Sequence, residues 1–208
     1  MNAFLTDPAQ IETESMRIIR ANLQRSWLEQ ELPVVQRLIH TTGDPDLEKV
    51  IAIHPRAIEA GLKALRQGAT IVTDVEMVKS GISQSKLAHL GGRVECFLNQ
   101  PHIPVLAQEL GITRTMAAFR AHKDVFAGSI VAIGNAPTAL LELLHLADNP
   151  AWRPALVIGM PVGFVGAKES KDLLWERQEI PSITVLGTRG GSPLAAAAVN
   201  ALIMMALG

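Results

Sequence analysis

The stretch "SIVAIGNAPTALLELL", residues 129–144, decides the fold class. Its first six residues form a short apolar run that ends in glycine, which is typical of a strand buried on both faces. A turn with Asn135 and Pro137 follows, and then an apolar segment long enough for a helix. A strand that leads through a short turn into a helix is the repeating unit of α/β proteins.

The same unit recurs over the last two thirds of the chain. Helix-length segments separate the apolar runs, so strands and helices alternate. This alternation predicts an α/β fold with a mainly parallel, Rossmann-like sheet of about five strands flanked by helices. The predicted strands are residues 69–74, 93–98, 129–134, 155–159 and 182–187.

The length and the first third of the chain complete the prediction of the architecture. A chain of 208 residues is within the range of one compact domain, so we expect a single domain that spans residues 1–208. Apolar residues recur with helical spacing in residues 10–24 and 54–68, and we expect the first third to be helical.

Composition excludes several classes of protein. A formal net charge of −1 gives no basic excess for nucleic-acid binding, and a content of 48% apolar residues excludes a disordered chain. The one cysteine, Cys96, allows no intramolecular disulfide. The N-terminus lacks the pattern of a secretory signal, and the longest apolar run, residues 193–208, is shorter than a membrane span. We therefore expect a cytoplasmic protein without a nucleic-acid or membrane partner.

Glycine- or proline-bearing turns follow the last three predicted strands, at residues 133–140, 158–170 and 186–198. In the first turn, Asn135 can cap a helix and leave backbone N–H groups that suit a carboxylate or phosphate, although a purely structural turn fits equally well. In the third turn, Ser192 can cap the next helix and Arg189 offers a forked donor to an anion. None of the turns has the spacing of a dinucleotide or P-loop motif.

A short helix with an unusual polar face lies in the first third. Pro33 suits its first turn, Gly43 suits its end, and its apolar residues form one stripe. Arg37 and His40, in "RLIHTTGDPD" (37–46), lie three residues apart on the opposite face. A histidine at a helix C-terminus beside an arginine can exchange protons near neutral pH, but a solvated polar face explains the pattern too. No histidine pair has the spacing of a metal site.

Four strings in this order resemble the precorrin-8X methylmutase family, whose members are also called cobalt-precorrin-8 methylmutases. The resemblance covers essentially the whole chain. The strings are "RLIHTTGDPDL", "GSIVAIGNAPTALLELL", "PALVIGMPVGFVGAKESKDLL" and "IPSITVLGTRGGSPLAAAAVNALI".

The resemblance implies an isomerase of cobalamin biosynthesis that moves a methyl group from C-11 to C-12 of the corrin ring. The product would be hydrogenobyrinate, or cobyrinate when the substrate carries cobalt. His40 matches the family's catalytic histidine, which exchanges a proton with the macrocycle, and Ser15, Arg37 and Arg114 match substrate-contacting positions. The carboxylate rim of a corrinoid would also suit the turns with Asn135 and Arg189.

The family further implies a homodimer with its active site near the subunit interface, and no cofactor or protein-bound metal. Two alternatives remain at this point. One is a corrinoid carrier that binds the macrocycle without converting it. The other is a nucleotide-dependent α/β oxidoreductase or transferase, which only the glycine-bearing turns suggest.

Overall fold

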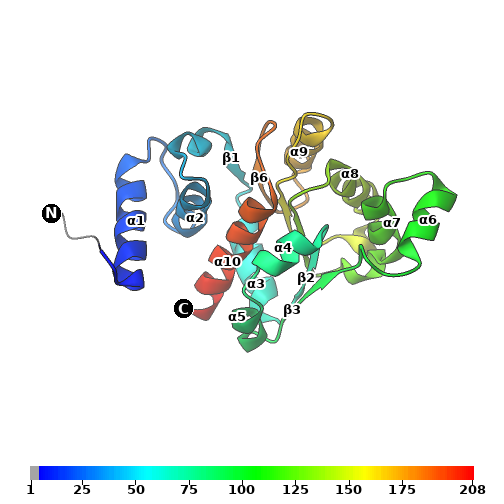
Figure 1. The fold of residues 1–208 in the computed structure, drawn as a ribbon, viewed down its shortest axis with the longest axis horizontal. Coiled ribbons are helices and arrows are strands. Elements are labelled where there is room, and N and C mark those ends of the chain that lie inside the picture. Colours follow the sequence, from blue (N-terminus) through cyan, green and yellow to red (C-terminus); the bar gives the residue numbers. More distant parts are fainter. Residues whose placement is uncertain (1–4) are drawn as a thin grey trace.

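The protein is a three-layer α/β structure in which one six-stranded sheet lies between two sets of helices (Figure 1). The computed structural model describes residues 5–208. All five predicted strands are present, and the predicted fold class is confirmed. The strands are β1 (Ile51–Ile53), β2 (Thr70–Thr73), β3 (Arg93–Cys96), β4 (Ile130–Ile133), β5 (Leu156–Gly159) and β6 (Ser182–Val185).

The sheet order is β1-β6-β5-β4-β2-β3, and all neighbours are parallel except β1 and β6. The sixth strand, β1, was not predicted, because three residues in a mainly helical region give no strand periodicity. Its partner β6 lies about 130 residues further along the chain, so only the tertiary fold reveals the pairing: Ile51 lies opposite Val185. β1 closes the edge of an otherwise parallel sheet.

Helices connect the strands and cover both faces of the sheet. Two of them, α5 and α6, are short and were not predicted. The helices are α1 (Pro8–Asn22), α2 (Leu32–Thr42), α3 (Ala57–Arg66), α4 (Glu76–Gly81), α5 (Gln84–His89), α6 (Ile103–Leu110), α7 (Arg114–Ala121), α8 (Pro137–Leu146), α9 (Ala167–Glu176) and α10 (Ser192–Leu207). Residues 5–208 also contain three 3₁₀ helices: η1 (Pro45–Val50), η2 (Lys123–Val125) and η3 (Pro150–Trp152).

Alternate residues of the strands contribute to two separate cores. In β4, Ile130 and Ala132 face a core shared with α2, α3 and α10, while Val131 and Ile133 face a core shared with α8. This alternation is the two-residue period of a strand, applied to a sheet that is buried on both faces. The first core is the larger one, and its helices surround the candidate site.

The C-terminal helix α10 lies at the centre of that first face. It contains no charged residue, and ten of its sixteen residues are buried against neighbours that include α2, α3 and α4 (Figure 1). The apolar run of residues 193–208 is therefore a buried helix of the core. Within residues 5–208, no helix is both long and apolar enough to span a membrane.

The N-terminal helix α1 is attached to this face by a buried carboxylate. Glu48 is 5% exposed, and its carboxylate accepts hydrogen bonds from the backbone N–H groups of Gln24 (2.9 Å) and Arg25 (2.8 Å) and from Nε1 of Trp27 (2.9 Å). Burial alone would raise the pKa of Glu48, but these three donors together outweigh it and hold the pKa below its usual value. Glu48 thereby fixes the segment between α1 and α2.

We expect Glu48→Gln to lower the free energy of unfolding by about 2 kcal/mol at pH 7, because it weakens charge-assisted hydrogen bonds in a buried site. A depressed pKa stabilises the fold above the carboxylate's unfolded pKa, and this contribution is lost as the pH falls through the folded pKa. The difference between wild type and variant should therefore shrink below about pH 4. Urea unfolding followed by tryptophan fluorescence measures it. Glu29→Gln, at a largely exposed carboxylate, is the control, and an equal loss there would contradict the assignment.

Candidate functional site

Helix α2 forms as its sequence predicts. Its apolar stripe is fully buried, with Val34, Val35 and Leu38 at 0% exposure, and Pro33 lies in its first turn. Gly43 ends the helix in the left-handed conformation, with φ of 63°. The stripe packs against α10, so the opposite face of α2 points away from the core. His40 is exposed on that face, as expected.

Arg37 and His40 lie beside the N-terminal helix. The guanidinium of Arg37 is paired with the carboxylate of Glu12 on α1. The hydrogen bond and charge of Arg37 hold the pKa of Glu12 below its usual value, with smaller contributions from the charges of His40 and Lys86. Ser15 lies one turn after Glu12 and donates its hydroxyl to the carbonyl of Ile11 (2.8 Å). The structure therefore gathers three of the predicted residues, Ser15, Arg37 and His40, around α1 and α2.

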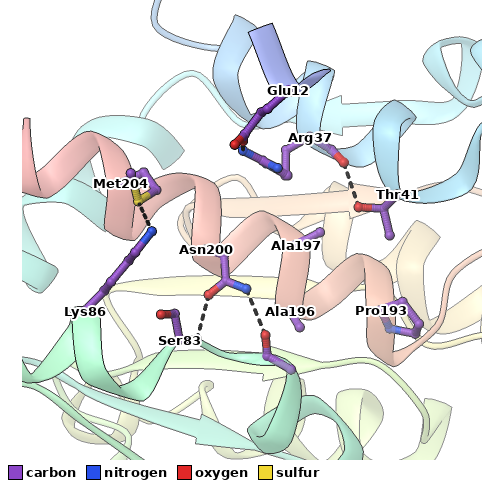
Figure 2. Close-up of a pocket in the computed structure, with 11 residues that line it drawn as sticks. Glu12, Arg37, Thr41, Ser83, Lys86, Pro193, Ala196, Ala197, Asn200 and Met204 are labelled. Carbon is purple, nitrogen blue, oxygen red and sulfur yellow. Dashed lines mark hydrogen bonds and ion pairs between the residues drawn. The ribbon is translucent and has the colours of Figure 1, made fainter. Parts of the chain in front are cut away.

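A cavity of about 500 Å³ opens between these two helices and the pair α4–α5 (Figure 2). Small residues of α10, Ala196 and Ala197, form its floor, and the charged side chains stand on its walls. His40 is not among the residues that line the cavity, but it directly precedes Thr41, which is one of them. The lining residues are Glu12, Arg37, Thr41, Gly81, Ser83, Lys86, Pro193, Ala196, Ala197, Asn200 and Met204.

Asn200 ties one wall of the cavity to its floor. Its amide oxygen accepts a hydrogen bond from the backbone N–H of Ser83 (2.9 Å), and its amide nitrogen donates to the carbonyl of Gly81 (2.8 Å) (Figure 2). A Cβ on Gly81 would lie 2.8 Å from Cβ of Ala196, so only glycine allows α4 to approach α10 this closely. The turn between α4 and α5 is therefore held at a defined place on α10.

The first glycine-bearing turn differs from its prediction. Its N–H groups are not free, because the carboxylate of Asp74 accepts hydrogen bonds from Gly134 (3.0 Å), Asn135 (2.8 Å) and Ala136 (2.8 Å). Asp74 is 1% exposed and directly follows β2, which is adjacent to β4 in the sheet. The predicted N-cap role of Asn135 is also wrong, since Ala136 holds that position and Asn135 has an exposed side chain. The chain itself supplies the anion at this helix N-terminus.

The third turn also uses its polar groups within the chain. The guanidinium of Arg189 is paired with the carboxylate of Asp44, just beyond the end of α2. The fully buried Lys171 donates from Nζ to the carbonyl of Arg189 (2.5 Å), and burial lowers its pKa to about 8. The predicted cap by Ser192 is wrong, because Gly191 is the N-cap and Ser192 is already helical. A substrate carboxylate would have to compete with Asp44 for Arg189.

Arg114 lies far from the other predicted residues. It begins α7, where its guanidinium donates to the carbonyl of Leu98 (3.2 Å) and to Oδ1 of Asn99 (3.3 Å). Helices α1 and α2 lie at one end of the long axis of the molecule, and α6 and α7 lie at the other (Figure 1). One chain therefore does not bring Arg114 together with Arg37 and His40.

Of the residues that line the cavity, only Arg37 was predicted as a site residue, and Glu12, Lys86 and Asn200 are among those that were not. Asn200 carries the clearest signal, because it interrupts an otherwise apolar helix. Glu12 and Lys86 look like ordinary solvated charges on amphipathic helices, and only the fold shows that they face one cavity. Among residues 5–208, no group of three potential metal-ligating side chains is clustered so as to hold an ion.

A sequence profile of the precorrin-8X methylmutase family matches residues 10–205. The chain belongs to this family. A precorrin-8X methylmutase of Pseudomonas aeruginosa is 43% identical over 96% of this chain and 96% of that protein. A cobalt-precorrin-8 methylmutase of Methanocaldococcus jannaschii is 37% identical over 99% of this chain and 98% of that protein. Relatives of both names thus match the chain over almost its whole length.

A solved structure gives the same result for the fold. The crystal structure of a precorrin-8X methylmutase from Thermus thermophilus superimposes with a TM-score of 0.84 and 40% sequence identity. The match covers 95% of this chain and 97% of that one. The family and the fold named by the sequence motifs are both confirmed.

We expect Asp74→Asn to lower the free energy of unfolding by about 2 to 3 kcal/mol, because an amide cannot accept all three N–H bonds in a buried site. Thermal or urea unfolding measures the loss. The exposed Asp148→Asn variant should change stability by less than about 0.5 kcal/mol. Equal stability of Asp74→Asn and wild type would show that the turn does not need its internal anion.

Proposed function

We propose that the protein is an isomerase of cobalamin biosynthesis that moves the methyl group of a precorrin-8 macrocycle from C-11 to C-12. The activity follows from membership of the methylmutase family. The observation that best supports the residue assignment is the position of His40, one turn after Arg37 on the exposed face of α2 and beside the cavity. A proton-exchanging group and an anion-binding group thus face the same region.

The cavity suits the chemistry of such a substrate. A corrinoid has a flat apolar body and a rim of acetate and propionate carboxylates. The floor of small α10 residues offers a flat apolar surface, and Arg37 and Lys86 place cations on the walls. An apolar surface with a few fixed polar groups is the usual composition of a ligand site.

In this proposal His40 acts first as a general acid and then as a general base. The imidazolium donates its proton to a nitrogen of the macrocycle, the methyl group migrates from C-11 to C-12, and the proton returns to the imidazole. No atom is gained or lost, and no nucleophile is required. The protein contributes a positioned acid and a binding surface that holds the ring in one orientation.

The reaction as proposed needs no cofactor, and cobalt, where present, is part of the substrate. Relatives named for the cobalt-containing and the metal-free substrates match the chain similarly, at 40% identity for a protein of Priestia megaterium and 43% for that of Pseudomonas aeruginosa. The proposed substrate is therefore precorrin-8, with or without cobalt. Time courses with both forms would distinguish them.

We further propose that the active enzyme is a homodimer in which Arg114 serves the site of the partner. Two features support this. His40 is exposed in the single chain, although proton exchange with a ring nitrogen benefits from exclusion of water. Arg114 is at the opposite end of the molecule from α2, so it can act beside His40 only from a second copy (Figure 1).

We expect His40→Ala to bind hydrogenobyrinate as wild type does but to convert precorrin-8 at least about a hundredfold more slowly, because general acid catalysis is lost. Visible spectra recorded over time after mixing measure the conversion. His145→Ala, at a largely exposed histidine of α8, should convert at the wild-type rate.

An unchanged rate for His40→Ala would contradict the role of His40. Wild-type protein that binds the macrocycle and never converts it would instead identify a corrinoid carrier.

A hybrid dimer tests the shared site. We co-express differently tagged His40→Ala and Arg114→Ala chains and purify the hybrid through both tags. If Arg114 acts in the partner's site, one of the two sites of the hybrid is intact, and its activity should be about half that of wild type. Each variant homodimer has two impaired sites. A hybrid no more active than the two variant homodimers would place Arg114 and His40 in the same chain's site. An Arg114→Ala homodimer as active as wild type would remove Arg114 from the site.

A further inference from the structure

Lys86 is a cation of the cavity that has no carboxylate partner among residues 5–208. Its Nζ lies 3.1 Å from Sδ of Met204, and no other polar contact of this ammonium is found in the described part of the chain (Figure 2). A thioether is a weak acceptor, whereas an ammonium group has three donors. The contact with Met204 leaves most of the hydrogen-bonding capacity of Lys86 unused.

The structure holds Lys86 in a defined place. The turn before α5 is tied to α10 by both ends of the Asn200 amide, and Lys86 is the third residue of α5. The neighbouring Leu87 is fully buried and anchors the same helix in the core. The backbone of Lys86 is thus fixed at the wall of the cavity, while its exposed side chain can adjust to a ligand.

The charges of the cavity are not balanced. Among residues 5–208, the lining includes two cationic residues, Arg37 and Lys86, and one acidic residue, Glu12. Glu12 is already paired with Arg37, so an arriving carboxylate must exchange with Glu12 to reach Arg37. It meets no such competitor at Lys86. The cavity therefore keeps a net positive charge on the wall opposite α1 and α2.

We propose that Lys86 is a carboxylate-binding residue that holds a peripheral acetate or propionate group of the substrate, on the wall of the cavity opposite Arg37. This inference rests on the proposed function, because it takes a corrinoid as the ligand. Two cations on opposite walls hold a flat molecule at two points of its rim. Such a pair restricts the rotation of the bound molecule over the apolar floor and also contributes to the affinity for it.

Hydrogenobyrinate is the probe, and its binding is followed by visible absorbance at low and moderate salt. We expect Lys86→Met to weaken binding about tenfold, which corresponds to about 1.4 kcal/mol, and to reduce the dependence of affinity on salt. Lys86→Arg should stay within a few-fold of wild type. Lys63→Met removes an exposed lysine of α3 outside the cavity and should have no effect. In turnover of precorrin-8, Lys86→Met should raise KM by more than it lowers kcat.

Two results would overturn the assignment of Lys86 and leave the proposed function intact. In the first, the wild-type protein converts precorrin-8 and Lys86→Met binds hydrogenobyrinate as tightly as wild type does. In the second, Lys86→Arg binds hydrogenobyrinate as weakly as Lys86→Met does. A wild-type protein that neither binds hydrogenobyrinate nor converts precorrin-8 would overturn the proposed function, and the role of Lys86 with it. Unfolding midpoints of the variants establish that each one is folded.

Discussion

The close packing of α10 against its neighbours is the constraint on which the rest of the site depends. Small residues make it possible: a Cβ on Gly81 would lie 2.8 Å from Cβ of Ala196, and a Cβ on Gly134 would lie 2.6 Å from Cα of Ser192. Interiors this dense tolerate little added volume. Because α2 and α4 pack directly against the same helix, backbone packing sets the distance across the cavity. It also sets the distance between the charged side chains on opposite walls.

The protein separates the charges that maintain its fold from those that can serve a ligand. Asp74 and Glu48 are buried, and each carboxylate accepts three hydrogen bonds from N–H groups of the chain. Buried Lys171 donates to a backbone carbonyl. A buried charge must be satisfied in this way because its desolvation is otherwise costly. The charged residues of the cavity are partly or largely exposed, so their pairs can be exchanged at low cost.

The sequence predicted those features that depend on local pattern. Five strands, the stripe of α2 and its end at Gly43 follow from periodicity and from the conformational freedom of glycine. What it could not predict depends on partners distant in the chain. The N–H groups around Asn135 look free until the fold brings Asp74, about 60 residues earlier, to the adjacent strand. The strand β1 has no signal apart from its pairing with β6. The cavity draws on α1, α2, α4, α5 and α10, and no single segment carries its pattern.

The wall formed by α1 is the part of the cavity that can move most easily. None of the residues of α1 is buried, and Ile19 and Leu23 make only partial contact with the core. The other contacts of the helix are polar. They include the pair of Glu12 with Arg37 and a hydrogen bond from Gln36 to the carbonyl of Met16 (2.7 Å), while Glu48 holds the segment that follows the helix. Segments with few buried apolar contacts open at low free-energy cost. A ligand carboxylate that replaces Glu12 at Arg37 would remove one of these contacts and supply another, so entry of a large flat substrate need not disturb the core beneath α10.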